Sequence, residues 1–376
     1  MGGINIGIVV KFDFTNSSPF SNGITQNAVV LRECLRRIDA VDNVYFVNLG
    51  TSQDFSSSAW NQLSDFTIDL KDAVERVNVL LTGTVKIRGE AVDAIRKRGI
   101  KLVNLVMGNE YYAFCEDVLF KEDGLSLQRF KKYDALWLLP HHFKTNKDLS
   151  EALHGTKAQV CPFIWSPEFI EKSLQELSLA GQVSNTRSSA TGKRISIFEP
   201  NINMVKTSVF PMVIAEKLNE KKPELVESVN IFCLERIAHK KHFQEFATSL
   251  ALYESRKSKF MGRKPIVWAL SEHTDMVLSH QQDNSLNYLY FDVAWMGYPL
   301  VHNAHMIKEL GFYYPDFDAD EAVKVIMDVI ENVNGDPTFL QSYLQKSRDY
   351  ISNFLPGHSK NVSDYKALLE KLFEET

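Results

Sequence analysis

Polar and charged residues of the types that bind phosphate groups lie at the end of the apolar run 195–199 and just after it. Glu199 ends the run, and Lys206, Thr207 and Ser208 follow after a short polar segment. A helix is expected to begin near Ser208, so its unpaired N–H groups would lie beside an ammonium group and two hydroxyl groups. Together these groups suit a diphosphate. The alternative is an exposed lysine beside a hydroxyl residue that caps the helix.

A second polar turn follows the run at 275–279 and includes His280 and Asn284. The helix expected after this turn carries Asp292 among apolar residues. Because a carboxylate in such a helix is costly unless it is paired, Asp292 is predicted to have a partner or a ligand. His280 could bind a ligand, but His280 and His302 could equally be hydrogen-bonded histidines at strand ends.

A third polar segment, residues 11–27, joins the first apolar run to the first expected helix. The N–H groups at such a helix start attract anions, so Gly23 and Thr25 are predicted to border a site for an anion or a polar ligand. An ordinary capped loop between a strand and a helix would explain the segment almost as well. The segment lacks the GxGxxG pattern, which argues against a dinucleotide-dependent oxidoreductase.

Two clusters of possible metal ligands lack the pattern that a metal site needs, and we predict no metal. Asp316, Asp318 and Asp320 alternate along the chain, but the helix expected after them makes Asp318 or Asp320 a natural N-cap. His141 and His142 are adjacent, without further ligands at a suitable spacing. The serine-nucleophile, Walker A and HExxH motifs are absent from the sequence as well.

Short apolar runs alternate with segments of helical period along most of the chain. This pattern is typical of parallel sheets wound with helices, since strands buried on both faces are almost continuously apolar. The runs are residues 4–10, 44–47, 77–81, 102–107, 135–139 and 160–164, then 195–199, 229–234, 265–270, 275–279 and 299–303. The predicted fold class is therefore α/β, with two doubly wound Rossmann-like domains that bind ligands at the carboxyl ends of their strands. A ligand shared by both domains would sit in a cleft between them.

The composition is that of a globular protein. The chain has 376 residues, enough for two domains, with 44% hydrophobic and 24% charged residues. Its net charge of −5 argues against a polybasic nucleic-acid coat, so a DNA partner would need a local basic patch. The four cysteines lie far apart and indicate packed thiols in a reducing compartment. Since we find neither a signal peptide nor a membrane span, we expect a cytoplasmic protein, in the host cytoplasm if a phage encodes it.

Several long segments carry a resemblance to one known family. They include YDALWLLPHH at 133–142, IFEPNINMVKTSVFPM at 197–212 and SHQQDNSLNYLYFDVAWMGYPLVHN at 279–303. Through nearly its whole length, the chain resembles a largely uncharacterised family of GT-B-like glycosyltransferases found in bacteria and phages. The resemblance implies two doubly wound domains that face a cleft, with C-terminal helices that cross back to the first domain. The implied parts are an acceptor-binding domain at 1–166, a linker at 167–194, a nucleotide-sugar-binding domain at 195–340 and C-terminal helices at 341–376.

The resemblance also implies a metal-independent transfer from a UDP-sugar, with no further cofactor. Lys206 and the amides near Asn284 to Asn287 would bind the donor diphosphate, and Asp292 would bind the ribose. Asn284 replaces the earlier glutamate of the usual pair, which leaves the contact to the sugar open. The donor-binding residues expected are Gly23, Glu199, Lys206, His280, Asn284, Asn287, Tyr288 and Asp292. The base that activates the acceptor hydroxyl is expected among Asp13, Glu110 and His141, which follow strand ends of the first domain.

Two classes of acceptor follow from the resemblance. Phage members include transferases that add arabinose to 5-hydroxymethylcytosine in DNA, and other members resemble enzymes of bacterial capsule, O-antigen or other surface glycan assembly. We expect transfer of arabinose or a hexose to 5-hydroxymethylcytosine in double-stranded DNA of a T-even-like phage, with the bacterial glycan as the alternative. The basic residues that could hold DNA phosphates are Lys240, Lys241, Arg256, Lys257 and Arg263. A sugar-binding module without turnover and a DNA-binding regulator are the alternatives that are not enzymes.

Overall fold

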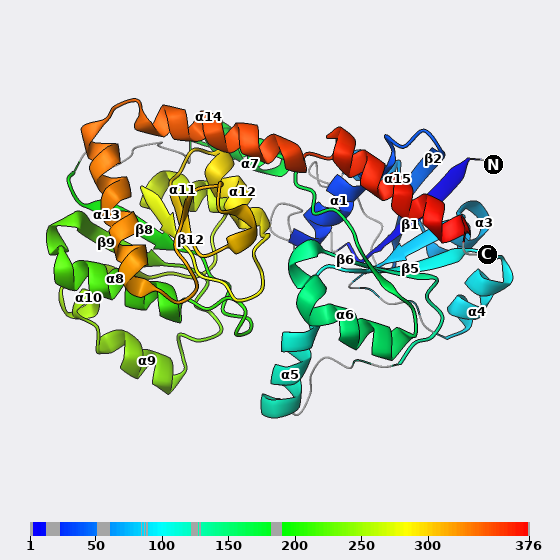
Figure 1. The fold of residues 1–376 in the computed structure, drawn as a ribbon, viewed down its shortest axis with the longest axis horizontal. Helices are drawn as coiled ribbons and strands as arrows, with labels where there is room; N and C mark the ends of the chain where they lie inside the picture. The colour runs from blue at the N-terminus through cyan, green and yellow to red at the C-terminus, as the bar shows by residue number, and fades with distance from the viewer. Residues whose placement is uncertain are drawn as a thin grey trace. The chain divides into compact units, whose positions relative to one another are not determined.

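The computed structural model describes residues 3–12, 23–50, 61–83, 85, 87, 89–121, 127, 129–181 and 190–374. The chain forms two compact units (Figure 1). Unit 1 comprises Met1–Phe169 and Asn353–Thr376, and unit 2 comprises Ile170–Ser352. Each unit contains one parallel sheet with helices, which confirms the predicted α/β class with two doubly wound Rossmann-like domains. The predicted cleft between the domains stays a prediction.

The sheet of unit 1 has seven parallel strands in the order β3-β2-β1-β4-β5-β6-β7. They are β1 (Ile4–Val10), β2 (Val41–Asn48), β3 (Thr67–Ile68), β4 (Val79–Thr82), β5 (Lys101–Val106), β6 (Ala135–Leu138) and β7 (Ala158–Val160). The order reverses between β1 and β4, and ligands of such sheets bind outside the carboxyl ends at that point. Both strands are almost wholly buried, which explains their apolar sequences.

The C-terminal helix α15 (Ser359–Glu374) packs within unit 1, beside α1 (Gly23–Leu35). Figure 1 shows α15 in red next to α1 in blue. The Tyr365 hydroxyl group of α15 donates a hydrogen bond of 2.9 Å to the carbonyl oxygen of Pro162. The other helices of this unit are α2 (Asn61–Ser64), α3 (Leu70–Arg76), α4 (Glu90–Lys97), α5 (Glu110–Phe120) and α6 (Pro140–His154).

The sheet of unit 2 has six parallel strands in the order β10-β9-β8-β11-β12-β13. They are β8 (Lys193–Ile197), β9 (Val226–Ile231), β10 (Ser258–Phe260), β11 (Met276–Leu278), β12 (Leu300–His302) and β13 (Phe312–Tyr313). The central neighbours β8 and β11 are far apart in sequence, so the sheet order reverses here too. This reversal predicts a ligand site at the carboxyl ends of β8 and β11.

Among the helices of unit 2, α8 packs against α13 and α10, and α14 packs against α12 and α13. The helices are α7 (Glu168–Leu179), α8 (Val209–Lys221), α9 (Lys241–Thr248), α10 (Ala251–Glu254), α11 (Ile266–His273), α12 (Tyr288–Trp295), α13 (Ala319–Gly335) and α14 (Phe339–Ile351). Within the part of the chain that the structure describes, none of the helices combines the length and apolar character that a membrane crossing requires.

Two of the predicted strands differ in the structure. The run at 265–270 was expected to be a strand, and this is wrong, because residues 266–273 form α11. Pro265 is the N-cap of this helix, and its residues Val267, Ala269 and Leu270 are buried. A short apolar run fits a buried helix as well as a buried strand, which accounts for the error. The run at 160–164 was also expected to be a strand, but β7 ends at Val160, so only its first residue is in the sheet.

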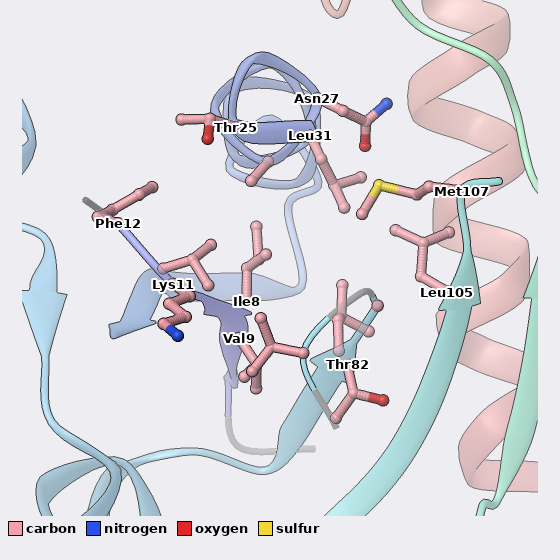
Figure 2. A pocket seen from close by; sticks show the side chains of 15 residues that line it. Ile8, Val9, Lys11, Phe12, Thr25, Asn27, Leu31, Thr82, Leu105 and Met107 are labelled. Atoms are coloured by element: carbon pink, nitrogen blue, oxygen red, sulfur yellow. The ribbon is translucent and has the colours of Figure 1, made fainter. Parts of the chain in front are cut away.

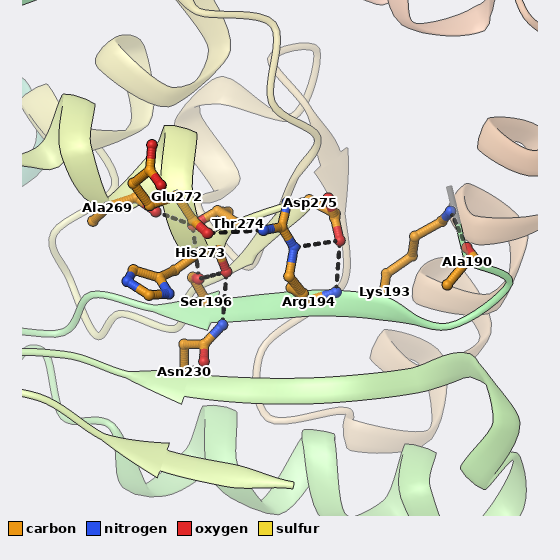
Figure 3. A network of polar contacts seen from close by, with 10 residues as sticks. All are labelled: Ala190, Lys193, Arg194, Ser196, Asn230, Ala269, Glu272, His273, Thr274 and Asp275. Atoms are coloured by element: carbon orange, nitrogen blue, oxygen red, sulfur yellow. Dashed lines mark hydrogen bonds and ion pairs between the residues drawn. The ribbon is translucent and has the colours of Figure 1, made fainter. Parts of the chain in front are cut away.

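A polar network joins the amino ends of β8 and β11 (Figure 3). The Arg194 guanidinium group donates hydrogen bonds of 3.0 and 2.8 Å to the two carboxylate oxygens of Asp275, whose side chain is 5% exposed. The same guanidinium group donates to the carbonyl oxygen of Glu272 at 2.8 Å. Nearby, the hydroxyl groups of Ser196 and Thr274 are 2.8 Å apart. This network fixes the two strands whose opposite ends carry the candidate site.

Candidate active site

The loops that follow β8 and β11 meet at the carboxyl edge of the unit 2 sheet. The backbone N–H group of Gln282 donates to the carbonyl oxygen of Val205 at 2.8 Å. The backbone N–H group of His280 donates to Oε1 of Glu199 at 3.1 Å. The two polar segments that the sequence analysis selected separately therefore form one site, as expected for neighbouring parallel strands.

Asn201 determines the shape of the loop after β8. Its backbone has a φ of 51°, and its Oδ1 accepts hydrogen bonds from the backbone N–H and the hydroxyl group of Ser208, at 2.9 and 3.1 Å. Its Nδ2 donates to the carbonyl oxygen of Glu199 at 2.8 Å. Ser208 is the N-cap of α8, so Asn201 holds the start of this helix beside the end of β8. The pattern of residues around Asn201 did not indicate this role, although asparagine is enriched at positive φ.

Glu199 is fully buried between the two loops. Its Oε1 accepts hydrogen bonds from the Ser279 hydroxyl group and from the His280 N–H group, whereas its Oε2 has no hydrogen-bond partner among the described residues. Burial raises the pKa of the Glu199 carboxyl group to about 7, although the charge of Lys206 and the two hydrogen bonds lower it. A carboxyl group with this pKa can exchange a proton near neutral pH.

Lys206 is partly exposed just before the start of α8. Burial lowers the pKa of its ammonium group, and the negative charge of Glu199 raises it. No described residue forms a hydrogen bond or an ion pair with the ammonium group within 4.0 Å. The side chain can therefore turn to a phosphate group of a ligand without losing a strong partner.

His280 follows β11 and is buried among aromatic rings. Its ring centroid lies 4.4 Å from the ring centroids of both Phe210 and Phe317. Its Nδ1 is 3.1 Å from the Tyr314 hydroxyl group, which donates a hydrogen bond to the carbonyl oxygen of Ser279 at 3.0 Å. Burial lowers the pKa of the imidazole to about 4, so His280 is neutral at physiological pH.

The start of α12 completes this edge of unit 2. Asn287 is the N-cap, and its side chain accepts a hydrogen bond from the N–H group of Leu289 at 3.3 Å. Tyr288 is the first helical residue, and Asp292 lies one turn further on; both are partly exposed. The backbone N–H group of Asn284 already donates to Oε1 of Gln281 at 2.5 Å, so this N–H is not available to a phosphate in the structure as it stands.

Other candidates from the sequence have structural roles. His302 is fully buried, with Nε2 2.5 Å from the carbonyl oxygen of Leu310 and Nδ1 accepting from the N–H group of Ala304 at 3.0 Å. His302 is therefore a hydrogen-bonded histidine at a strand end, which is one of the two alternatives predicted from the sequence. Asp318 is the N-cap of α13, as predicted, and accepts from the N–H group of Glu321 at 2.9 Å. Among the described residues, no group of His, Cys, Asp and Glu is arranged to hold a metal ion.

Unit 1 has a small cavity of about 100 Å³ at the carboxyl ends of β1, β4 and β5, covered by α1 (Figure 2). Most of its lining is apolar, and its polar lining residues include Lys11, Thr25, Asn27 and Thr82. Gly23, the first residue of α1, is exposed two positions before Thr25. The cavity lies where the strand order of this sheet reverses, which is the expected place for a ligand.

Of the three residues predicted as the catalytic base, the two that the structure describes do not line this cavity. Asp13 lies outside the described residues. Glu110 is the first residue of α5 and is partly exposed. His141 is buried in the first turn of α6, with its ring centroid 3.8 Å from that of His142. Neither Glu110 nor His141 belongs to the cavity lining, so their role as base stays a prediction.

The basic residues proposed to hold DNA all lie in unit 2, and several have partners. The ammonium group of Lys257 donates to Oδ1 of Asn219 at 3.1 Å and to the carbonyl oxygen of Pro223 at 2.6 Å. Lys241 forms an ion pair with Glu245 at 3.5 Å. The other residues of this set, Lys240, Arg256 and Arg263, are exposed. Lys240 and Arg256 are thus better placed than Lys257 to contact a phosphate in solution.

Comparisons with known proteins identify a family and similar folds. Residues 6–369 match the family described as "Protein of unknown function (DUF2827)". No curated protein matches the chain by sequence. The chain is structurally similar to a glycosyltransferase from Rickettsia africae, with 13% identity, a TM-score of 0.57 and 100% of both chains covered.

Two further solved structures have similar folds. An O-GlcNAc transferase mutant from Thermobaculum terrenum has 12% identity and a TM-score of 0.56, over 99% of this chain and 68% of that chain. A UDP-forming trehalose-phosphate synthase from Burkholderia xenovorans has 12% identity and a TM-score of 0.53, over 98% of each chain. At such low identities the similarity shows the fold alone, and it confirms the expected GT-B-like architecture.

Proposed function

The chain belongs to the DUF2827 family of proteins of unknown function, and we propose that it is a glycosyltransferase that uses a UDP-sugar as donor. The observation that carries this proposal is the site at the carboxyl edge of unit 2. There, Lys206 has no described ion-pair partner and lies just before the start of α8, and the loop before α12 touches the same segment. Ammonium and helix N–H groups are the donors that bind a diphosphate.

In the proposed reaction, the positive groups stabilise the departing UDP. Lys206 and the starts of α8 and α12 face the growing negative charge on the diphosphate, a role that a divalent metal ion has in other transferases. Asp292 accepts hydrogen bonds from the ribose hydroxyl groups. A general base in unit 1, among Asp13, Glu110 and His141, removes the proton of the acceptor hydroxyl group. We therefore propose a transfer that does not depend on a metal ion.

For the acceptor, we propose 5-hydroxymethylcytosine in double-stranded DNA. Support comes from the family resemblance and from the exposed cations Lys240 and Arg256. The small cavity of unit 1 is compact and mostly apolar, as expected of a pocket that takes a single flipped base. Flipping costs a few kcal/mol, which phosphate contacts have to offset, so binding to DNA should weaken steeply as the salt concentration rises.

The donor is tested by calorimetric titration of UDP into Lys206→Ala and Asp292→Ala variants. Each variant loses a charge-assisted hydrogen bond, so we expect the affinity for UDP to fall about tenfold to a hundredfold, with folding intact. Lys221→Ala, on the exposed last turn of α8, is the matched control. Unchanged affinity in both variants would leave the proposed donor site without support.

The acceptor is tested by incubating hydroxymethylated DNA with the protein and a panel of UDP-pentoses and UDP-hexoses. The expected product is DNA whose mass has increased by one sugar residue. Charge reversal at Lys240 and Arg256 should weaken the binding of this DNA and reduce its salt dependence. If no sugar is transferred and the binding does not depend on salt, the bacterial surface glycan becomes the better acceptor.

A further inference from the structure

Unit 2 contains two buried histidines at strand ends, and their hydrogen bonding differs. Both ring nitrogens of His302 are engaged by the backbone, at Leu310 and Ala304. In His280 only Nδ1 is engaged, by Tyr314, whereas Nε2 is buried without a hydrogen-bond partner among the described residues. Most buried polar atoms of proteins are hydrogen-bonded, so an exception of this kind calls for a reason.

The hydrogen bonds of Tyr314 determine which ring nitrogen of His280 carries the proton. A tyrosine hydroxyl group has one hydrogen, and Tyr314 donates it to the carbonyl oxygen of Ser279 at 3.0 Å. At 3.1 Å from Nδ1 of His280, the hydroxyl oxygen can then only accept, so the proton lies on Nδ1. Nε2 therefore has a free lone pair and acts as a hydrogen-bond acceptor. Because the buried imidazole is neutral at physiological pH, the lone pair is retained there.

The surroundings of Nε2 suit contact with a ligand. The imidazole forms one aromatic cluster with the rings of Phe210 and Phe317, whose centroids lie 5.0 Å apart. Phe317 is 58% exposed, so the cluster that contains the imidazole reaches the surface of unit 2. Phe210 belongs to the first turn of α8, three residues after Thr207, which places the imidazole beside the proposed diphosphate site.

We propose that Nε2 of His280 accepts a hydrogen bond from a hydroxyl group of the sugar that is transferred, and that His280 is thereby a specificity-determining residue. This inference rests on the proposed glycosyltransferase function. A lone pair repels phosphate oxygens, which are acceptors too, and the neighbouring Glu199 carboxyl group does not favour an anion either. A sugar hydroxyl group supplies the missing donor. Tyr314 is a positioning residue, since it acts only through the tautomer of His280.

The tautomer and its ligand are observed directly by NMR. In protein labelled with ¹⁵N at histidine, long-range proton–nitrogen spectra distinguish a protonated ring nitrogen from a bare one, and the His280→Gln variant assigns the signal. We expect Nδ1 to be protonated in the free protein. UDP-glucose, UDP-N-acetylglucosamine and UDP-arabinose are the probes, and at least one should shift the Nε2 signal, whereas UDP alone should not.

Affinity measurements on variants give an independent readout. Tyr314→Phe removes the group that fixes the tautomer, so the affinity for the responding UDP-sugar should fall about threefold to tenfold, as for the loss of one hydrogen bond. Its affinity for UDP should stay unchanged. Tyr313→Phe, at the adjacent and partly exposed tyrosine, is the matched control and should change neither value. His280→Gln, which keeps an acceptor at the ε position, should retain more affinity than His280→Leu.

The outcomes separate this inference from the function on which it rests. If neither UDP nor any of the UDP-sugars binds, the proposed donor is wrong and the inference falls with it. If a UDP-sugar binds but leaves the Nε2 signal unmoved, or if UDP alone moves it to the same extent, only the role of His280 is overturned. A protonated Nε2 in the free protein would also overturn it.

Discussion

Glu199→Gln should remove a pH-dependent loss of stability that the buried carboxyl group causes. Burial raises the pKa of Glu199 from its ordinary value of 4.5 to about 7. Below pH 4.5 the group is protonated in both the folded and the unfolded chain, so it does not affect the pH dependence. Between pH 4.5 and 7 the unfolded chain ionises while the folded chain keeps the proton, so the free energy of unfolding falls as the pH rises. A shift of this size corresponds to about 3 kcal/mol, which is reached above pH 7.

Glutamine copies the shape of the protonated carboxyl group and cannot ionise. Its Oε1 can keep the hydrogen bonds from Ser279 and His280. Urea unfolding at a series of pH values from 4.5 to 8.5 should give similar stability for the two proteins at the acid end, and a wild type less stable by about 3 kcal/mol at the alkaline end. The exposed Glu331 of α13 provides a control, Glu331→Gln, for the change of residue type itself. Two parallel stability curves would show that Glu199 has an ordinary pKa and refute the reasoning.

Three further results are expected. Asp275→Ala should lower the free energy of unfolding by about 3–5 kcal/mol in urea, because the largely buried guanidinium group of Arg194 loses the carboxylate that neutralises its charge. The double variant Arg194→Met/Asp275→Leu should recover much of this loss, and a loss below about 1 kcal/mol in the single variant would contradict the reasoning. Asp318→Ala should lower the free energy of unfolding by about 1 kcal/mol, because α13 loses its N-cap, whereas Asp318→Ser should lower it much less. Equal thermal stability of the two variants would count against the cap. EDTA should leave sugar transfer largely intact, and complete inactivation that Mn²⁺ reverses would disprove a metal-independent reaction.

The sequence predicted the fold class because buried parallel strands are long apolar runs. The central strands β1, β4, β5 and β6 lie within or beside such runs. The edge strands β3 and β13 have two residues each and lie outside them, so no periodicity could reveal them. The strands β3 and β13 form because β2 and β12 offer them backbone hydrogen-bond partners, which is a tertiary effect.

The candidate site was predictable only where a local pattern was sufficient. Lys206 and the starts of α8 and α12 followed from polar segments after apolar runs, and the structure places them at one edge of one sheet. The hydrogen bond that fixes the tautomer of His280 joins residues 34 positions apart. The ion pair of Arg194 with Asp275 joins residues 81 positions apart. Partners at such separations depend on the strand order, which the spacing of residues in a single sequence does not contain.

The polar side chains at the two ends of the β8 and β11 pair differ in how fully they are hydrogen-bonded. At the amino ends, Arg194 and Asp275 satisfy each other with several hydrogen bonds. At the carboxyl ends, Glu199 and His280 each keep one buried polar side-chain atom without a partner among the described residues. Unsatisfied polar atoms raise the free energy of the ligand-free protein, and a ligand that forms hydrogen bonds with them lowers it again. The firmly held amino ends thus allow the carboxyl ends to keep an arrangement that favours ligand binding over stability.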